Sequence, residues 1–433
     1  MAYFRLMIFA VMAFVMCLFS PSVFASDSGV IKLELADAAA VGMGGAYAGE
    51  ADRSSAVYYN PAGIVQIDSM EAQAGLTWVA PQIKFEARNA NNGGTSEMIR
   101  DNYIFPNVFI TVPVIKDKFY LGIGESTDFG GGNDWNPNSF SRYSTIKDSI
   151  TDMDFRLVGA YKVTEKWSVG AGVVNDQSQF EHLMAVSNSI PGSSDAASLF
   201  KGNDSAWGFD LSTMFKINDK NQIGLDYKSP IHHKYDGALY LSNLNPASLG
   251  PLFNNQTSFN SKAIQKLTLP PSITLGYSFK PTSKWTINLD VEWTDWSQYK
   301  KQITSYPYVT PAQATALLNY DSAREWHAVW SESIGAQYAV TDKFRVRAGY
   351  EHHKSPVPEC TYDTAFPDSD TNAYTMGIGY DITSRLTIDL AYIAAYEESR
   401  RVVNTVSQGL GADLSGKYTE FINIATMQLT YKF

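Results

Sequence analysis

The sequence has few cysteines and no long apolar run beyond its amino terminus. Of its two cysteines, Cys17 lies in the apolar amino-terminal stretch and only Cys360 lies beyond it. If that stretch is removed, no intrachain disulfide can form. After residue 25, no segment approaches the roughly 18 consecutive apolar residues that a membrane-spanning helix needs. The sequence therefore excludes a disulfide-stabilised fold and a helix-bundle membrane protein.

Positive charge is also scarce, as are side chains that bind metals or act as nucleophiles. Lysine and arginine number 34 against 44 aspartates and glutamates, with a formal net charge of −10 and no basic cluster, so we predict no nucleic-acid partner. Histidines stand in pairs at 232–233 and 352–353. Neighbouring residues of a strand point to opposite faces, so neither pair can chelate one metal ion alone. No serine lies in a recognisable nucleophile setting. We predict no bound metal, no cofactor and no enzymatic activity.

The one long apolar stretch has the pattern of a secretory signal peptide. Arg5 supplies a positive start, Leu6 to Phe19 form the apolar region, and Val23-Phe24-Ala25 offers a cleavage site with a small residue at the scissile bond. We therefore assign residues 1–25 to a signal peptide cleaved near Ala25. The mature chain begins near Ser26.

In place of continuous apolar runs, the mature chain alternates apolar and polar residues. In the last 13 residues, 421–433, apolar and aromatic side chains occupy one face and Thr, Gln and Lys the other. The same period of two recurs at residues 285–294, 344–351, 374–381 and 386–392. Aromatic residues make up 13% of the chain, which suits the aromatic girdles of a membrane barrel. The pattern predicts strands lying between lipid and a polar lumen, as in a bacterial outer-membrane β-barrel.

Short and long polar links alternate between these strands. The short links lie at residues 115–118, 163–166, 217–220, 280–284, 340–343 and 382–385. The long ones lie near residues 86–102, 129–151, 182–204, 233–263, 300–325, 355–371 and 401–419. Six short turns join twelve strands. With a first strand at 71–85 and the last at 421–433, we predict an all-β fold. It is a 14-stranded antiparallel transmembrane barrel over residues 69–433, with short turns and both ends in the periplasm.

Residues 26–68 do not alternate. They are few for a separate periplasmic domain, and their glycines allow the tight backbone packing that a plug inside a lumen requires. The glycines at 42–45 lack the Gly-Lys-Ser/Thr that would follow in a phosphate-binding loop. We predict that residues 26–68 form an N-terminal hatch, or plug.

Several segments of the chain carry recognisable motifs. Residues 38–51 (AAAVGMGGAYAGEA) followed by Asn60-Pro-Ala-Gly63 are similar to the hatch of the FadL family of outer-membrane transporters. Residues 269–277 with 290–297 resemble its eighth and ninth strands, and residues 347–380 its eleventh and twelfth. The resemblance covers essentially the whole mature chain. Its hatch motif comprises Gly42, Gly44, Gly45, Asn60, Pro61 and Gly63.

The resemblance implies passive uptake of long-chain fatty acids or aromatic hydrocarbons, and the sequence leaves open which. It implies an outer groove between the third and fourth long loops and an inner apolar pocket near the mature amino terminus. The groove candidates are apolar residues of these two loops: Leu183, Met184, Leu199, Phe200, Leu239, Leu241, Leu252 and Phe253. Exposed apolar residues commonly mark a ligand site. They could equally pack on one another as small helices.

The resemblance also implies an inward kink in the third strand that opens the wall sideways. That strand is expected at Phe119 to Phe129, followed by Gly130, Gly131 and Gly132, and glycine at a strand end marks a bend or the start of a flexible loop. Arg345 and Arg347 are candidates to meet a substrate carboxylate. More simply, they brace the polar lumen and hold the hatch.

The expected partners follow from this assignment. They are a hydrophobic small molecule as substrate, outer-membrane lipid and lipopolysaccharide around the barrel, and the barrel assembly machinery during biogenesis. We expect a monomer. The alternative function is that of a general porin or a structural barrel, but a water-filled pore has no need of some 40 residues before its first strand.

Overall fold

A computed structural model describes residue 32 and residues 34–88, 94–188, 190, 192–316, 322–405 and 412–433. The predicted signal peptide and its cleavage site lie outside the described residues. Among the described residues, no helix is long and apolar enough to cross a membrane.

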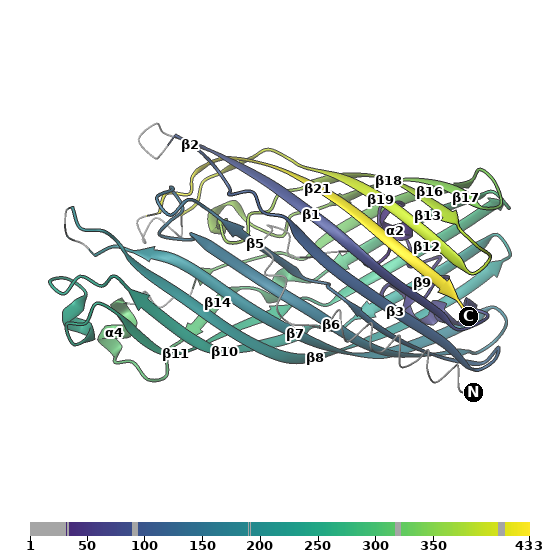
Figure 1. The fold of residues 1–433 in the computed structure, drawn as a ribbon, viewed down its shortest axis with the longest axis horizontal. Helices are drawn as coiled ribbons and strands as arrows, with labels where there is room; N and C mark the ends of the chain where they lie inside the picture. Colours follow the sequence, from purple (N-terminus) through teal and green to yellow (C-terminus); the bar gives the residue numbers. More distant parts are fainter. Residues whose placement is uncertain are drawn as a thin grey trace.

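Within the described residues, fourteen antiparallel strands close into a barrel (Figure 1). β1 pairs with the last strand along its whole length, from Glu71 opposite Lys432 to Ala87 opposite Gly416, so the sheet has no free edge there. The predicted fold is confirmed. In chain order the wall consists of β1 (Glu71–Ala87), β3 (Tyr103–Ile115), β4 (Phe119–Ser126) with β5 (Gly130–Asp134), β6 (Lys147–Lys162), β7 (Trp167–Val186), β8 (Ala196–Asn218), β9 (Asn221–Lys228) with β10 (Ile231–Ser242), β11 (Phe259–Leu269) with β12 (Ser272–Thr282), β13 (Trp285–Thr294) with β14 (Lys301–Ser305), β16 (Val329–Ala339), β17 (Phe344–His353), β18 (Thr371–Asp381), β19 (Leu386–Glu397) and β21 (Gly416–Lys432).

Two wall strands are interrupted at prolines. Pro230 separates β9 from β10, and Pro270 with Pro271 separates β11 from β12. Proline cannot donate a backbone hydrogen bond, so each break falls where the ladder cannot continue regularly.

The two ends of the barrel differ in their connections. All six short turns fall between wall strands where they were predicted, and the carboxyl terminus lies at the same end (Figure 1). The opposite end carries the long connections and their small elements: β2 (Thr95–Glu97), η3 (Gly250–Phe253), η4 (Trp296–Gln298), α4 (Pro311–Ala316), β15 (Ser322–Ala323), η5 (Glu359–Thr361) and β20 (Arg400–Val402).

Two of the predicted long loops are much shorter than expected. The β7–β8 ladder continues to Val186 opposite Ala196, and the β10–β11 ladder to Leu241 opposite Phe259. The bounds 182–204 and 233–263 were therefore wrong. Backbone pairing and burial of alternate apolar side chains extend these strands beyond the alternation of apolar and polar residues on which the prediction was based.

The wall strands bury polar side chains and expose apolar ones. Along β21, Gln428 is fully buried whereas Met427 and Leu429 are 41% and 42% exposed. Soluble proteins show the reverse distribution, and a barrel in lipid turns its apolar side chains outward. The predicted alternation, with the polar face toward the lumen, is confirmed.

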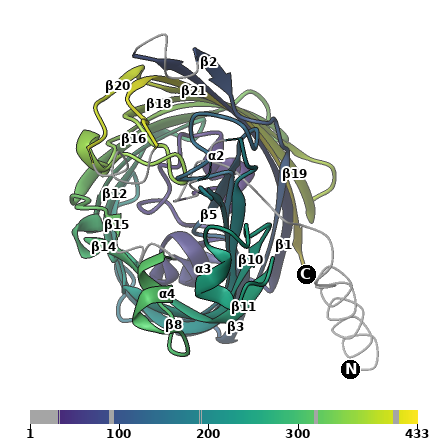
Figure 2. The same cartoon turned by 90° about the vertical axis from the view of Figure 1, so that its left-hand side faces the viewer.

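The described N-terminal segment, residues 34–70, lies inside the ring of strands (Figure 2). It contains α2 (Ala38–Val41), α3 (Ala56–Tyr59) and η1 (Pro61–Gln66), whose side chains are almost all buried. Asn60 caps η1, accepting from the backbone N–H of Ala62 at 3.1 Å, and Pro61 is its first residue.

Two glycines of this segment are required by its close packing. Gly44 has a φ of +70°, and a Cβ there would lie 2.8 Å from the carbonyl oxygen of Tyr350 on β17. A Cβ on Gly63 would lie 2.2 Å from the carbonyl oxygen of Ala51. A larger residue at either position would clash with this neighbouring backbone and displace the N-terminal segment.

Candidate ligand cavity and wall gap

The N-terminal segment is tied to the wall by hydrogen bonds to buried carboxylates. The backbone N–H groups of Tyr47 and Ala48 donate to one oxygen of Asp290 on β13, at 2.8 and 2.7 Å. Two converging N–H donors compensate the carboxylate for its lost hydration. A Cβ on Gly49, the next residue, would lie 2.6 Å from the backbone nitrogen of Tyr277, so backbone and wall touch directly here.

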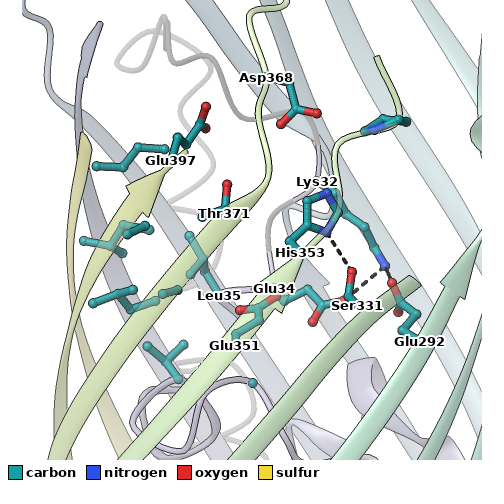
Figure 3. A pocket seen from close by; sticks show the side chains of 18 of the residues that line it. Lys32, Glu34, Leu35, Glu292, Ser331, Glu351, His353, Asp368, Thr371 and Glu397 are labelled. Atoms are coloured by element: carbon teal, nitrogen blue, oxygen red, sulfur yellow. Dashed lines mark hydrogen bonds and ion pairs between the residues drawn. The ribbon is translucent and has the colours of Figure 1, made fainter. Parts of the chain in front are cut away.

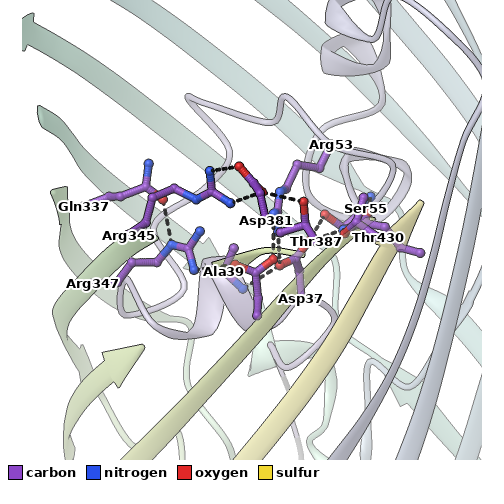
Figure 4. Close-up of polar contacts among 12 residues, drawn as sticks. Asp37, Ala39, Arg53, Ser55, Gln337, Arg345, Arg347, Asp381, Thr387 and Thr430 are labelled. Atoms are coloured by element: carbon purple, nitrogen blue, oxygen red, sulfur yellow. Dashed lines mark hydrogen bonds and ion pairs between the residues drawn. The ribbon is translucent and has the colours of Figure 1, made fainter. Parts of the chain in front are cut away.

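Arg53 forms the second tie. Its guanidinium donates to Asp389 on β19 at 2.7 Å and to Asp37 at 3.4 Å, and Asp37 also accepts from the Ser55 hydroxyl at 2.6 Å (Figure 4). Burial alone would lower the pKa of Arg53, but the carboxylates of Asp389 and Asp37 outweigh burial and raise it. We call Asp37, Arg53 and Asp389 the Arg53 latch. Its charges are buried but paired, so removing Arg53 would leave the buried carboxylate of Asp37 without a cation.

The two predicted carboxylate-binding arginines lie beside this latch. Arg345 donates from two guanidinium nitrogens to Asp381, at 2.9 and 2.5 Å. Arg347 donates to Asp389 and to Gln337, each at 2.7 Å (Figure 4). Both line a polar cavity of about 270 Å³ at the short-turn end. These ion pairs and hydrogen bonds are those expected of arginines that brace the lumen and hold the N-terminal segment. That either arginine contacts a substrate carboxylate stays a prediction.

A different cavity, of about 120 Å³, has an apolar wall (Figure 3). It lies between the start of the N-terminal segment and the wall strands β13, β16–β19 and β21, with Trp296 beside it. The apolar wall comprises Leu35, Val41, Ala373, Ile393, Ala395, Ile422 and Ile424, which pack together as part of one buried cluster. The polar wall comprises Lys32, Glu34, Glu292, Ser331, Glu351, His353, Asp368, Thr371 and Glu397. We call this space the Leu35 cavity.

Lys32 is the centre of the polar wall. Its ammonium group lies 3.0 Å from a carboxylate oxygen of Glu34 and donates a hydrogen bond to Glu292 (Figure 3). Burial would lower the pKa of Lys32, but the carboxylates of Glu292 and Glu34 outweigh it and raise the pKa. Beside Lys32, Ser331 and His353, which are paired in register on β16 and β17, share a hydrogen bond of 2.7 Å (Figure 3).

The barrel wall is incomplete beside this cavity. β3 pairs with β4 only from Val108 opposite Glu125 onward, and among the described residues Tyr103 to Asn107 pair with β1 alone. β5 pairs only with β6 in the described part of the chain. A small space of about 10 Å³ lies in this gap, lined by Leu35, Ala36, Phe105, Pro106, Asn107, Ser126 and Thr127. We call it the wall gap.

The third wall strand is broken where it borders the gap. The prediction of one strand from Phe119 to Phe129 was wrong, because β4 ends at Ser126, opposite Asp154 of β6. Pairing with β6 resumes only at Gly130, opposite Thr151, so the register of the pairing shifts by one residue. Between them, the Thr127 hydroxyl donates to the Asp152 carbonyl at 3.1 Å, and Asp128 pairs with Arg156 at 2.5 Å. Side-chain contacts thus replace the ladder, as at a β-bulge.

Phe129 connects the break to the Leu35 cavity. Its backbone forms an isolated antiparallel bridge with Lys32, and its ring packs edge-on against Trp296 with centroids 5.9 Å apart. Gly130, Gly131 and Gly132 follow as the first residues of β5 and are buried. The candidates for the lateral opening therefore lie next to the cavity, while the gap itself begins at Ser126.

Six of the predicted groove residues lie on strands and two on a short 3-10 helix. Leu183 and Met184 belong to β7, Leu199 and Phe200 to β8, Leu239 and Leu241 to β10, and Leu252 and Phe253 to η3. Leu239 lies opposite Phe200 in the ladder, and Phe253 packs on Phe259 with ring centroids 4.8 Å apart. Phe200, Leu239, Leu241 and Phe253 are buried in a large apolar cluster near the long connections, Met184 is also buried, Leu183 and Leu199 are half-buried, and Leu252 is 38% exposed. The expectation of an exposed apolar loop surface was wrong for the five buried residues, and a groove at Leu183, Leu199 and Leu252 stays a prediction.

The predictions made from the sequence do not include the residues of the Leu35 cavity, although the lumen faces of two strands carry a signal for them. On β21, the lumen face is polar at Thr426 and Gln428 but apolar at Ile422 and Ile424. On β19, the same change occurs between Asp389 and Ile393. Apolar residues at lumen-facing positions of adjacent strands would have pointed to an apolar pocket at that height.

Comparison with known proteins identifies the family. A family model described as outer membrane protein transport protein (OMPP1/FadL/TodX) matches residues 22–433. The chain belongs to this family. The resemblance noted from the hatch motif is confirmed, and the family is one of outer-membrane transport proteins.

Individual members of the OMPP1/FadL/TodX family match along most of their length. The chain is 23% identical to the long-chain fatty acid transport protein of an Escherichia coli O6:H1 strain, over 86% of this chain and 87% of that protein. Its fold is similar to that of a Pseudomonas aeruginosa FadL homologue, with a TM-score of 0.82 and 21% identity over 93% and 100% of the two chains. It is also similar to the toluene transporter TbuX of Ralstonia pickettii, with a TM-score of 0.69 and 17% identity over 93% and 99%.

Proposed function

We propose that this protein passively takes up hydrophobic small molecules across the bacterial outer membrane, and that the Leu35 cavity is a binding site on their route. The observation that carries this proposal is the apolar wall around Ile393, Ile422 and Ile424, at the height where the lumen faces of β19 and β21 change from polar to apolar. Apolar surface of this kind stabilises a bound apolar ligand by roughly 25 cal/mol per Å² that is removed from water. The relatives named as fatty acid and toluene transporters support the same substrate class.

The proposed exit is sideways through the wall gap. Leu35 lines both the cavity and the gap, so the two spaces border the same residue. A ligand that left this way would enter the lipid phase without crossing the polar short-turn end, where the Arg53 latch and the paired arginines lie. Movement of the segment around Leu35 and Ala36 would suffice to join the two spaces.

In this proposal the N-terminal segment is a plug that blocks the lumen, and it has no catalytic role. Its burial within the barrel and its ties to Asp290 and Asp389 support this role, and they disfavour a general porin. The apolar cluster near the long connections, which contains Phe200, Leu239 and Phe253, would receive ligand from outside. No nucleotide or ion is required, because diffusion down a concentration gradient through an apolar route is sufficient.

Filling the cavity tests the proposal. Ala395 is buried and lines the Leu35 cavity, whereas its neighbour Ala394 lies on the opposite face of β19. We expect Ala395→Phe to reduce uptake of radiolabelled toluene and dodecanol about tenfold or more, and Ala394→Phe to leave it unchanged, because only the first side chain occupies space needed by a ligand. Heat-modifiable gel mobility checks that both variants fold. Normal uptake of both probes by a folded Ala395→Phe variant would contradict the assignment of the cavity.

The orientation with short turns in the periplasm is tested by thiol labelling of intact cells. Asp219 in the β8–β9 turn and Asn254 after η3 are both exposed, so reactivity depends on the side of the membrane and not on burial. In a Cys360→Ser background, which removes an exposed native thiol, we expect Asn254→Cys to react with an impermeant maleimide and Asp219→Cys to react only after lysis. Labelling of Asp219→Cys on intact cells would reverse the orientation.

A further inference from the structure

The polar wall of the Leu35 cavity has a strong excess of acidic groups. Its lining includes the carboxyl groups of five residues and, among the described lining residues, a single Lys or Arg, Lys32 (Figure 3). The five are Glu34, Glu292, Glu351, Asp368 and Glu397. A carboxylate ligand would bring another negative charge into this partly enclosed space, where charges interact more strongly than in water.

The lone cation of the wall is already paired. Lys32 contacts both Glu34 and Glu292, and its side chain is only 9% exposed. The residues that precede it in the mature chain, 26–31, include no lysine or arginine. Arg400, which lies near Asp368, donates to the carbonyl groups of Asp368 and Val357 and to the Ser355 hydroxyl. Among the described lining residues, a ligand carboxylate would therefore find a Lys or Arg cation only by displacing an existing ion pair.

Glu351 is the acidic group best placed to meet a ligand. It stands on the lumen side of β17 at the cavity, and among the described residues no hydrogen bond or ion pair engages its side chain. The apolar wall formed by Ile393, Ile422 and Ile424 lines the same space. A molecule whose polar end donates a hydrogen bond to Glu351 can place its apolar body against these isoleucines.

We propose that the Leu35 cavity binds an apolar molecule whose polar end donates hydrogen bonds and carries no negative charge, such as a long-chain primary alcohol or amine, and that it discriminates against carboxylates. This inference rests on the proposed function, because it assigns a substrate class to the same cavity. It separates this chain from relatives whose names specify fatty acids, since its cavity wall repels the head group that defines a fatty acid anion.

The test compares three ligands with the same twelve-carbon chain: dodecanol, dodecylamine and laurate. Equilibrium binding of each radiolabelled ligand is measured at pH 9.5 on the full-length protein in lipid nanodiscs, and the folded Ala395→Phe variant supplies the background for partition into lipid. We expect dodecanol and dodecylamine to bind about tenfold or more tightly than laurate, a difference of about 1.4 kcal/mol. Laurate binding as tightly as dodecanol would overturn the inference while leaving the proposed function intact.

A charge-removing variant of the same shape assigns the discrimination to the acidic wall. Glu351→Gln removes a carboxyl group and keeps the volume of the side chain. We expect it to tighten laurate binding severalfold, to weaken dodecylamine binding about tenfold and to change dodecanol binding little. Unchanged ratios among the three ligands in the folded variant would contradict a role for Glu351. If none of the three binds above the Ala395→Phe background, the cavity is not a ligand site, and the proposed function fails with the inference.

Discussion

Cross-linking the two sides of the wall gap is expected to stop uptake. If the ladder between β3 and β4 continued past Val108 and Glu125, Pro106 would face Thr127, and both residues line the gap. In a Cys360→Ser background, we expect the double variant Pro106→Cys/Thr127→Cys to transport normally when reduced. After treatment with a short cleavable bis-thiol reagent, toluene uptake should fall at least about tenfold, because the wall can no longer part. Reductive cleavage of the reagent should restore it.

A matched pair on the same strands controls for the chemistry. Ile110 and Ile123 already face each other in the β3–β4 ladder, away from the gap. Cross-linking Ile110→Cys/Ile123→Cys joins the same strands without closing the opening, so we expect uptake to remain normal. Full uptake by the Pro106/Thr127 pair in its cross-linked form, with complete reaction verified by mass spectrometry, would exclude a lateral exit at this site.

Deletion of residues 26–57 is expected to convert the protein into an open pore. All fourteen wall strands remain, so the barrel should still assemble, while the lumen loses the backbone that occupies it and gains the hydrated side chains of Asp290, Arg347 and Asp389. In planar bilayers, we expect the deletion variant to conduct ions steadily and the intact protein to be nearly silent. Selective uptake of hydrophobic molecules should be lost, because the Leu35 cavity loses one of its walls.

A single substitution tests whether the N-terminal segment blocks the lumen without deleting the segment. Arg53→Ala leaves Asp37 buried without its cation, whereas Asp389 keeps its ion pair with Arg347. Removing one partner of a buried ion pair typically costs about 3–5 kcal/mol, so the change should loosen the segment without removing it. We expect brief openings in bilayer recordings, intermediate between those of the intact and deleted proteins. A deletion variant as silent as the intact protein, with normal heat-modifiable mobility, would mean that these residues do not block the lumen.

The Leu35 cavity is built jointly by the N-terminal segment and the barrel. The segment contributes Lys32, Glu34 and Leu35, whereas the barrel contributes Glu292, Glu351 and most of the apolar wall. On the proposed route, movement of the segment around Leu35 would couple occupancy of the cavity to access to the wall gap.

The sequence by itself determined the barrel: its strand number, its six short turns and the lumen-facing side of each strand. These features are local, because a period of two and a turn of four or five residues can be recognised without knowing which strands become neighbours. The sequence was less informative about strand ends near the long connections. There, pairing between β7 and β8 and burial in the apolar cluster, rather than local composition, decide where a strand stops.

Only the tertiary structure decided where a ligand could bind. The Leu35 cavity is assembled from a segment near residue 35 and from strands that end after residue 420, and the wall gap arises because β4 and β5 meet β6 in different registers. The same is true of Arg347, whose partners on β16 and β19 become its neighbours only in the closed sheet. The physical reason is that a cavity is a property of side chains from distant segments that pack incompletely after barrel closure, and no single stretch of sequence records that packing.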